Sequence, residues 1–222
     1  MVYRSRMNLF HSAIFFKKEH TLDIVMQKSV LLIGWWLLVS AFIPPDKKVY
    51  WVVMNGSSLT VNGSTNINTF RCDIANYNVP DTLTCVKSSR FGILLPMDGK
   101  LNLSIEAFDC HNKMMTSDLR KTLKAKLYPL LTVKFISIKG FPDFKNPAKI
   151  TGFVDIGLAG VNKRFEINYL FTEDAKSMIL LKGDQRIHFS DFNLVPPSKL
   201  GGVIKANDEL DVEFRLNLKP IG

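Results

Sequence analysis

The chain has 222 residues, 46% of them hydrophobic, which is enough for a sizeable core and excludes global disorder. Its 29 basic and 20 acidic side chains give a formal charge of +9. This balance favours anionic surfaces such as phospholipid headgroups. The basic residues are scattered rather than gathered in one patch, so the charge argues against nucleic acid as a partner.

The first predicted element is an apolar run of 14 residues, from Val30 to Ile43. A membrane-spanning helix needs about 20 residues, so this run is too short to span a bilayer. It suits the central region of a secretory signal, because small residues end it at Ala41. We predict a leader over residues 1–41 that is cleaved after Ala41, with Met26 as the candidate translation start. The alternative is a buried helix of the mature domain.

Three cysteines, Cys72, Cys85 and Cys110, lie in the predicted mature domain, residues 42–222. None stands at the cleavage point to carry a lipid, so we expect the mature protein free in the periplasm or secreted. Export makes a disulfide plausible. The matching contexts Phe-Arg-Cys72 and Phe-Asp-Cys110 favour a Cys72–Cys110 bond between neighbouring strands. Cys72–Cys85 stays open as an alternative, because these two residues flank a turn almost symmetrically.

Most of the mature domain alternates apolar with polar residues, which predicts half-buried strands. The predicted strands are Val49–Val53, Leu59–Ile67, Phe70–Ala75, Thr82–Val86, Leu101–Phe108, Thr132–Lys139, Lys149–Leu158, Val161–Phe171 and Leu210–Leu218, together with one strand made of Ser177–Leu181 and Gln185–Phe189 that is broken near Gly183-Asp184. We expect residues 70–75 and 82–86 to form a hairpin, and Ala159-Gly160 to form a tight turn. Residues 87–100 and 190–202 are expected loops. The tally is eight to ten strands in one antiparallel domain.

One helix is predicted between Met114 and Lys126, where apolar residues recur every four positions as far as Leu127. Thr116 or Ser117 is the expected N-cap, and Pro129 closes the segment. One interpretation is a helix whose leucine stripe plugs the end of the strands. The other is a basic face that makes transient contact with an anionic membrane surface. That face consists of Arg120, Lys121 and Lys124.

Four blocks in order along the chain resemble the YceI-like family, whose best-known members are exported lipocalin-like barrels that bind polyisoprenoids. The blocks are Gly63–Asn66 with Phe70 and Cys72; Phe108, Met115, Leu119, Leu123-Lys124, Tyr128-Pro129 and Phe135; Ile150–Gly152 with Ala159–Lys163; and Asp191-Phe192, Pro196-Pro197, Gly202, Ile204-Lys205 and Leu210–Leu218. The cysteines resemble those of a cysteine-bearing branch. The resemblance implies an all-β fold, an up-and-down antiparallel barrel of about eight strands with one short helix at a barrel end and a tunnel for a long apolar chain.

The apolar strand faces supply the candidate lining of such a tunnel. The candidates are Leu103, Ile105, Val133, Phe135, Val154, Ile156, Phe165, Ile167, Val212, Phe214 and Leu216. From the residues alone we favour a filled core in which these side chains pack against one another. The resemblance implies a hollow barrel instead, in which burial of each methylene would contribute about 0.8 kcal/mol.

Catalytic motifs are not found in this sequence. It has neither a Gly-x-Ser-x-Gly elbow nor a Gly-rich phosphate loop, and His111 and His188 have no second ligand at metal spacing. We therefore expect no catalytic residue, no metal and no cofactor. The leading hypothesis is a non-catalytic exported protein that holds an isoprenoid or another long apolar lipid. The alternative is an envelope stress or scaffold domain with a filled barrel that binds a protein partner. A lipid esterase or isomerase would need a buried polar cluster.

Overall fold

The computed structural model of the chain describes residues 46–87 and 92–221, and the predicted leader with its cleavage point lies outside these residues. The predicted alternation produces long strands with one buried face, as in Lys149–Leu158. The strands are β1 Lys47–Thr65, β2 Thr69–Tyr77, β3 Thr82–Lys87, β4 Leu94–Asp98, β5 Lys100–Ser104, β6 Leu130–Lys139, β7 Lys149–Leu158, β8 Val161–Glu173, β9 Ile179–His188, β10 Ser198–Lys199 and β11 Ile204–Ile221.

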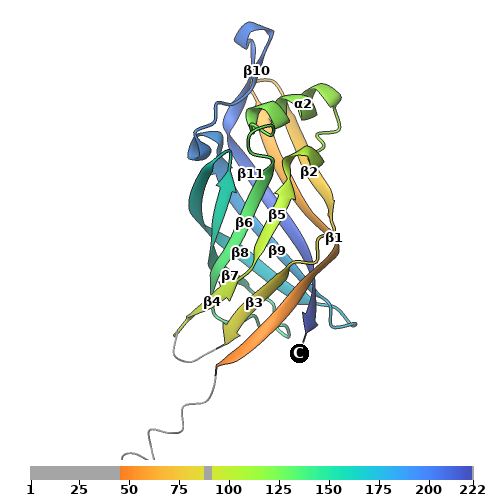
Figure 1. Cartoon of the computed structure of the whole chain (residues 1–222), viewed down its shortest axis with the longest axis vertical. Coiled ribbons are helices and arrows are strands. Elements are labelled where there is room, and N and C mark those ends of the chain that lie inside the picture. The colour runs from red at the N-terminus through yellow and green to blue at the C-terminus, as the bar shows by residue number, and fades with distance from the viewer. Residues whose placement is uncertain (1–45, 88–91, 222) are drawn as a thin grey trace, which may run out of the picture. The chain divides into compact units, whose positions relative to one another are not determined.

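The strands close into an antiparallel barrel, because β1 pairs with β11 on one side and with β2 and β3 on the other. Strands β2 and β3 lie end to end along β1, and β4 and β5 lie end to end along β6. With the two-residue β10 as an addition to β11, these strands fill eight positions around the barrel (Figure 1). The predicted eight-stranded barrel is therefore confirmed.

The predicted hairpin between residues 70–75 and 82–86 is wrong. Each segment pairs with β1 instead, in registers that include Val61 with Cys72 and Trp51 with Leu83. The segment between β2 and β3 continues along β1, because the amide of Val53 on β1 donates to the carbonyl of Asp81 at 2.8 Å. A proline cannot donate a ladder hydrogen bond, so the strand is interrupted at Pro80 without turning back.

Other predicted boundaries also differ from the structure. The strands expected at Val49–Val53 and Leu59–Ile67 are one strand, β1, and β10 lies within the expected loop 190–202. The strand expected to end at Phe108 ends at Ser104, where the chain enters a 3₁₀ turn, η2, over Ile105–Ala107. Strand β4 lies within the expected loop 87–100. Strand β9 runs unbroken through Gly183, because the ladders on both sides of that glycine continue.

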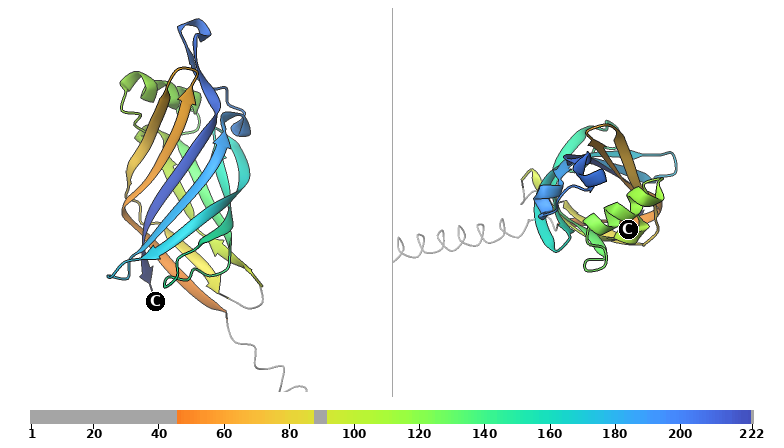
Figure 2. Two further views of the ribbon diagram at one scale, coloured as in Figure 1. Left: turned by 180° about the vertical axis from the view of Figure 1, so that it is seen from behind. Right: turned by 90° about the horizontal axis from the view of Figure 1, so that it is seen from above.

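The predicted helix is α2, Lys113–Thr122, and it lies at one end of the barrel (Figures 1 and 2). Its N-cap is Asn112 rather than Thr116 or Ser117: the Asn112 side chain accepts hydrogen bonds from two backbone amides at 3.0 and 3.1 Å. Thr116 faces the barrel instead, and its hydroxyl accepts from the amide of Cys110 at 3.0 Å. In the described residues no helix has both the length and the apolar character needed to cross a bilayer.

Two further 3₁₀ turns, η3 Phe189–Phe192 and η4 Leu200–Gly202, lie at the same end of the barrel as α2. The predicted disulfide is confirmed, since Cys72 of β2 is bonded to Cys110 in the segment after η2. Beside it, Asp73 and Asp109 form an isolated antiparallel bridge. Cys85 is a free, buried thiol. The bond therefore ties the segment that leads into α2 to the barrel wall.

Candidate functional site: the barrel interior and its mouth

The predicted lining residues belong to the barrel core. Nine of the eleven are buried, and the other two, Val212 and Phe214, are half-buried and pack against the core. Ile105 occupies η2 rather than a strand. Five of the eleven line one small cavity inside the barrel: Leu103, Val133, Phe135, Phe214 and Leu216. The remaining six do not line this cavity.

This central cavity has a volume of about 20 Å³ and is almost entirely apolar. Such a volume holds about one water molecule, and an apolar void of this kind stays dry. Its other lining residues are Ser58, Leu59, Tyr77 and Leu101. The middle of the barrel is therefore filled by its own side chains.

Aromatic rings make up much of that filling. Phe135, Tyr169 and Phe214 form a triangle in which the ring centroids are 6.0 to 6.4 Å apart. Two inward-facing glycines make room for these rings. A Cβ on Gly152 would stand 2.7 Å from the ring of Tyr169, and a Cβ on Gly183 would overlap the ring of Phe214. Only glycine permits so close an approach of a ring to the strand backbone.

The hydroxyl of Tyr169 is a polar atom without a partner in this core. The residue is fully buried, and no group in the described part of the chain hydrogen-bonds to the hydroxyl. Burial raises the pKa of Tyr169, so the phenol stays neutral. Leaving such a group unpaired costs about 1–3 kcal/mol. The hydroxyl of Tyr169, the only polar side-chain atom of this aromatic triangle, therefore has no partner among the described residues.

A second cavity, of about 260 Å³, lies at the barrel end that carries α2. We call it the mouth pocket. Its lining is mostly apolar, with an ion pair between Asp118 of α2 and Lys199 of β10, 2.5 Å apart, among its residues. The mouth pocket is lined by Thr65, Phe70, Cys72, Asn112, Met114, Met115, Asp118, Leu119, Phe189, Pro197, Lys199, Ile204 and Ala206.

The mouth pocket and the central cavity share no lining residue. On β1 the pocket reaches Thr65 and the cavity reaches Leu59, six residues away. At about 3.3 Å per residue, the two spaces are separated by roughly 20 Å along the strand. The core between them is packed, and Val61 and Val212, which face each other across β1 and β11, lie on this stretch. A chain entering from the mouth would have to displace these side chains to reach the centre.

Helix α2 forms one wall of the mouth pocket and is held firmly. Leu119 and Leu123 are buried in the core, whereas Leu127, which the sequence grouped with them, is exposed. Arg120 donates to the carbonyl of Phe108 at 3.0 Å and also to the carbonyl of Glu106. The leucine stripe thus closes part of the barrel end, as one of the two interpretations of this helix expected.

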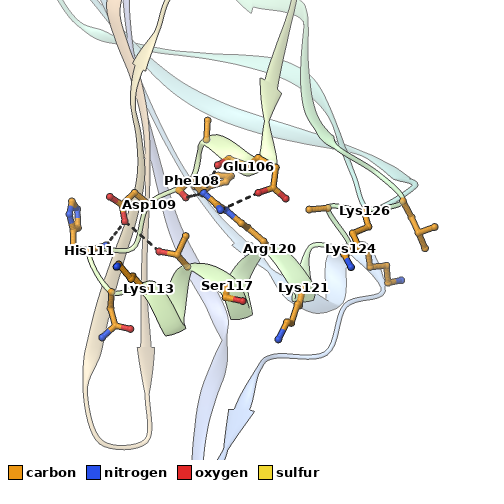
Figure 3. A pocket seen from close by; sticks show the side chains of 15 residues that line it. Glu106, Phe108, Asp109, His111, Lys113, Ser117, Arg120, Lys121, Lys124 and Lys126 are labelled. Atoms are coloured by element: carbon orange, nitrogen blue, oxygen red, sulfur yellow. Dashed lines mark hydrogen bonds and ion pairs between the residues drawn. The ribbon is translucent and has the colours of Figure 1, made fainter.

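The other side of α2 borders an open groove of about 1160 Å³ (Figure 3). The groove is lined by basic side chains, among them Lys113, Lys121, Lys124 and Lys126. In Figure 3, Lys113, Ser117 and Lys121 project from the same side of α2, while Arg120 turns back toward Glu106 and Phe108. The helix therefore separates an apolar pocket from a basic groove. The sequence predicted the basic face of this helix but not the apolar pocket.

One polar cluster lies around Asp73 of β2. His111 Nε2 lies 2.7 Å from Asp73 Oδ2, and Arg71 Nε lies 2.7 Å from Oδ1 of the same carboxyl. Burial raises the pKa of Asp73, but the hydrogen bonds from Arg71 and His111 outweigh burial and lower it overall. No hydroxyl or thiol bonds to His111 in residues 46–87 and 92–221, nor do these residues contain a group of three metal-ligating side chains. The dyad consequently lacks a nucleophile.

Comparison with known proteins places the fold. A polyisoprenoid-binding domain from Saccharophagus degradans superposes with a TM-score of 0.53 at 13% identity, covering 77% of this chain and 97% of that one. BcnA from Burkholderia cenocepacia superposes with a TM-score of 0.52 at 16% identity, covering 72% and 94%. The chain has the barrel fold of these proteins. This is the fold that the resemblance to the YceI-like family implied.

A YceI protein from Campylobacter jejuni also matches, with 20% identity and a TM-score of 0.40 over 56% of this chain and 72% of that one. No protein-family model matches the sequence, and neither does any curated protein. At these identities the comparisons establish the fold alone, so the function must be argued from the cavities and surfaces of this chain.

Proposed function

We propose that the protein is a non-catalytic binding protein for a long apolar chain, isoprenoid or acyl, that enters the barrel end beside α2. The observation that carries this proposal is the mouth pocket, a mostly apolar hollow of about 260 Å³ at the barrel end that carries α2. The fold shared with a polyisoprenoid-binding domain supports the choice of ligand class. Selectivity would come from chain length and width rather than from polar contacts.

The energetics suit a chain longer than the mouth pocket alone would hold. Each buried methylene contributes about 0.8 kcal/mol. A Kd of 1 μM requires about 8 kcal/mol, and the lost freedom of both molecules adds at least about 4 kcal/mol. Roughly 15 buried carbons are therefore needed. A chain of this length would extend inward from the mouth, pushing aside the half-buried Val212 and Phe214.

Binding of a fluorescent long-chain isoprenol, and organic extraction of the purified protein followed by mass spectrometry, test the proposal. Ala206 lines the mouth pocket, so Ala206→Phe should fill it and weaken probe binding at least tenfold. Ala75→Phe is the matched control, because Ala75 is exposed on β2. Thermal unfolding of both variants checks that they fold. A wild-type protein that carries no lipid and takes up neither an isoprenol nor a fatty-acid probe would overturn the proposal.

The filled interior favours a second candidate function, a rigid scaffold that binds a protein partner through its surface. The central cavity of about 20 Å³ is the observation behind it. In that case Phe135→Asp would unfold the protein, since Phe135 is fully buried, and no variant would show a separate loss of ligand. A pull-down that identifies one stoichiometric partner, together with lipid-free wild-type protein, would favour the scaffold.

We infer that the protein works outside the cytosol. The Cys72–Cys110 disulfide supports this location, because such bonds persist in oxidising compartments. The apolar run from Val30 to Ile43 supports export through a cleavable signal. The intact mass of protein recovered from the periplasm or medium should correspond to a chain that begins at residue 42. Recovery of the uncleaved, reduced chain from the cytosol would contradict this location.

A further inference from the structure

Four lysines at the α2 end of the barrel have no charged partner within residues 46–87 and 92–221. The segment Lys113–Lys126 carries five basic residues and a single acidic one, Asp118, which pairs with Lys199. Arg120 pairs with Glu106 at 3.1 Å. The lysines that form no ion pair with any residue in the described part of the chain are Lys113, Lys121, Lys124 and Lys126. Two carboxylates, Glu106 and Asp109, line the basic groove of Figure 3 beside five basic side chains, so a net positive charge remains around it.

Large apolar side chains project into solvent at the same end. Leu127 follows α2 and is 75% exposed, and Met114 in the first turn of α2 is 65% exposed. On the crest formed by β10, η4 and the start of β11, Leu200 is 74% exposed and Val203 is 69% exposed. Ile67, at the turn between β1 and β2, is 70% exposed. Figure 1 shows β10, α2 and the β1–β2 turn at one end of the barrel, opposite β3 and β4.

These projections are held in fixed relation to one another. Asn66, beside Ile67, donates from its side chain to the carbonyl of Val203 at 2.8 Å and accepts from the amide of Lys205 at 3.0 Å. The Asp118–Lys199 ion pair joins α2 to the crest. We call the five exposed apolar side chains the apolar tips: Ile67, Met114, Leu127, Leu200 and Val203. The apolar tips and the four unpaired lysines form one surface, which we call the docking face.

We propose that the docking face binds an anionic lipid bilayer, with the four lysines at the level of the phosphates and the apolar tips among the headgroups. Single apolar side chains on a surface are ordinary, and a stable protein interface needs a continuous patch of about 800 Å² per partner. Here the exposed apolar side chains belong to separate segments: α2 and the residues after it, the crest formed by β10, η4 and the start of β11, and the β1–β2 turn. A headgroup layer accommodates isolated tips without shape complementarity, and lysines reach phosphates with their long stems.

This inference goes beyond the proposed function and does not depend on it. Docking in this orientation would bring the mouth pocket, which Met114 and Met115 help to line, to the bilayer surface. Vesicle binding and probe uptake are separate measurements. A protein that takes up the isoprenol probe but ignores vesicles overturns the docking proposal alone. A protein that binds vesicles but takes up no probe overturns the proposed function alone.

Co-sedimentation with vesicles of phosphatidylglycerol and phosphatidylcholine, against phosphatidylcholine alone, tests the docking face. We expect the wild-type chain to bind the anionic vesicles and to be released by salt. Near an anionic surface each lysine changes binding roughly fivefold, so K113E/K121E/K124E/K126E should bind at least a hundredfold more weakly. The control K47E/K48E/K145E/K176E changes the net charge equally at other sites and should stay within about threefold of wild type. Any contribution of residues 1–45 is common to all these proteins.

A second pair of variants tests the apolar tips. Leu200→Asp/Val203→Asp should remove the part of vesicle binding that survives moderate salt, while Val79→Asp/Ile93→Asp, at exposed positions outside the docking face, should not. Equal losses in the two charge-reversed proteins, or no binding of wild type to anionic vesicles, would overturn the proposal. Sedimentation velocity tests whether the docking face instead binds a second copy of the chain. Self-association of the wild type that Leu200→Asp/Val203→Asp abolishes would support such a dimer and would overturn the membrane proposal.

Discussion

The ring of Phe214 on β11 lies over Gly183 on β9, its direct partner in the ladder, so closely that a Cβ on Gly183 would overlap the ring. Tyr169 on β8 approaches Gly152 on β7 in a similar way, at 2.7 Å from the position of a Cβ, although its direct ladder partner is Ile150. In both cases a missing side chain on one strand is replaced by a ring from a neighbouring strand. The two rings also pack against each other and against Phe135, and these contacts help to fill the middle of the barrel.

Gly183→Ala is expected to destabilise the protein by about 1–3 kcal/mol, because the added methyl forces the Phe214 ring out of its place. Urea unfolding monitored by circular dichroism measures the change. The double variant Gly183→Ala/Phe214→Leu should recover part of the loss, since the smaller side chain leaves room for the methyl. Additive losses in the double variant would show that the two residues do not interact in this way.

Removing the hydroxyl of Tyr169 should leave the stability unchanged or raise it by about 1 kcal/mol, because that hydroxyl is buried without a partner. Tyr77→Phe is the matched control. The Tyr77 hydroxyl bonds to Asp81 and accepts from the amide of Asn102 at 3.2 Å, so its loss should cost about 1 kcal/mol. Denaturant unfolding of Tyr169→Phe and Tyr77→Phe compares the two. A clear destabilisation by Tyr169→Phe would mean that a water molecule or ligand satisfies the hydroxyl.

The disulfide is expected to contribute about 4 kcal/mol to stability, since its ends are 38 residues apart in sequence and cross-linking restricts the unfolded chain. Cys72→Ser/Cys110→Ser should lower the unfolding free energy by about this amount. Burial raises the pKa of Cys85 to about 11, so this thiol should react with a thiol reagent only in the unfolded protein. Reaction of Cys85 under native conditions, or an unchanged unfolding free energy in the double variant, would contradict these expectations.

Acid should destabilise the protein partly through Asp73, whose pKa is lowered in the folded state by Arg71 and His111 despite burial. A carboxyl with a depressed folded pKa stabilises the fold above its unfolded pKa of about 4, and the contribution disappears as the pH falls through the folded value. Asp73→Asn should cost about 1 kcal/mol at pH 7 and reduce the loss of stability between pH 5 and pH 2.

Thermal unfolding across that pH range checks the Asp73 prediction. Asp98→Asn is the control, because Asp98 is exposed and forms no ion pair within residues 46–87 and 92–221. If Asp73→Asn and Asp98→Asn give the same acid profile as the wild type, the interactions of Asp73 with Arg71 and His111 do not contribute to the pH dependence.

Local patterns in the sequence determined the class of fold and most of the strands. The uninterrupted alternation at the C-terminal end produced the long strand β11, and Ala159-Gly160 formed the tight turn between β7 and β8 with positive φ at both residues. Matching contexts also identified the Cys72–Cys110 bond correctly. The alternation and the turn depend on residues a few positions apart along the chain. The disulfide joins residues 38 positions apart, but the residues next to each cysteine indicated it.

Only the tertiary structure decided which strands pair and how the interior is filled. Strands β2 and β3 both pair with β1, although Pro80 between them suggested a turn. The amide of Val53 on β1 donates to the carbonyl of Asp81, so the chain continues along β1 past the proline. Whether the inward faces enclose a tunnel or pack together depends on rings such as Phe214 meeting glycines such as Gly183 on another strand. The mouth pocket likewise joins segments more than a hundred residues apart, from Thr65 to Ala206, and no local pattern encodes their meeting.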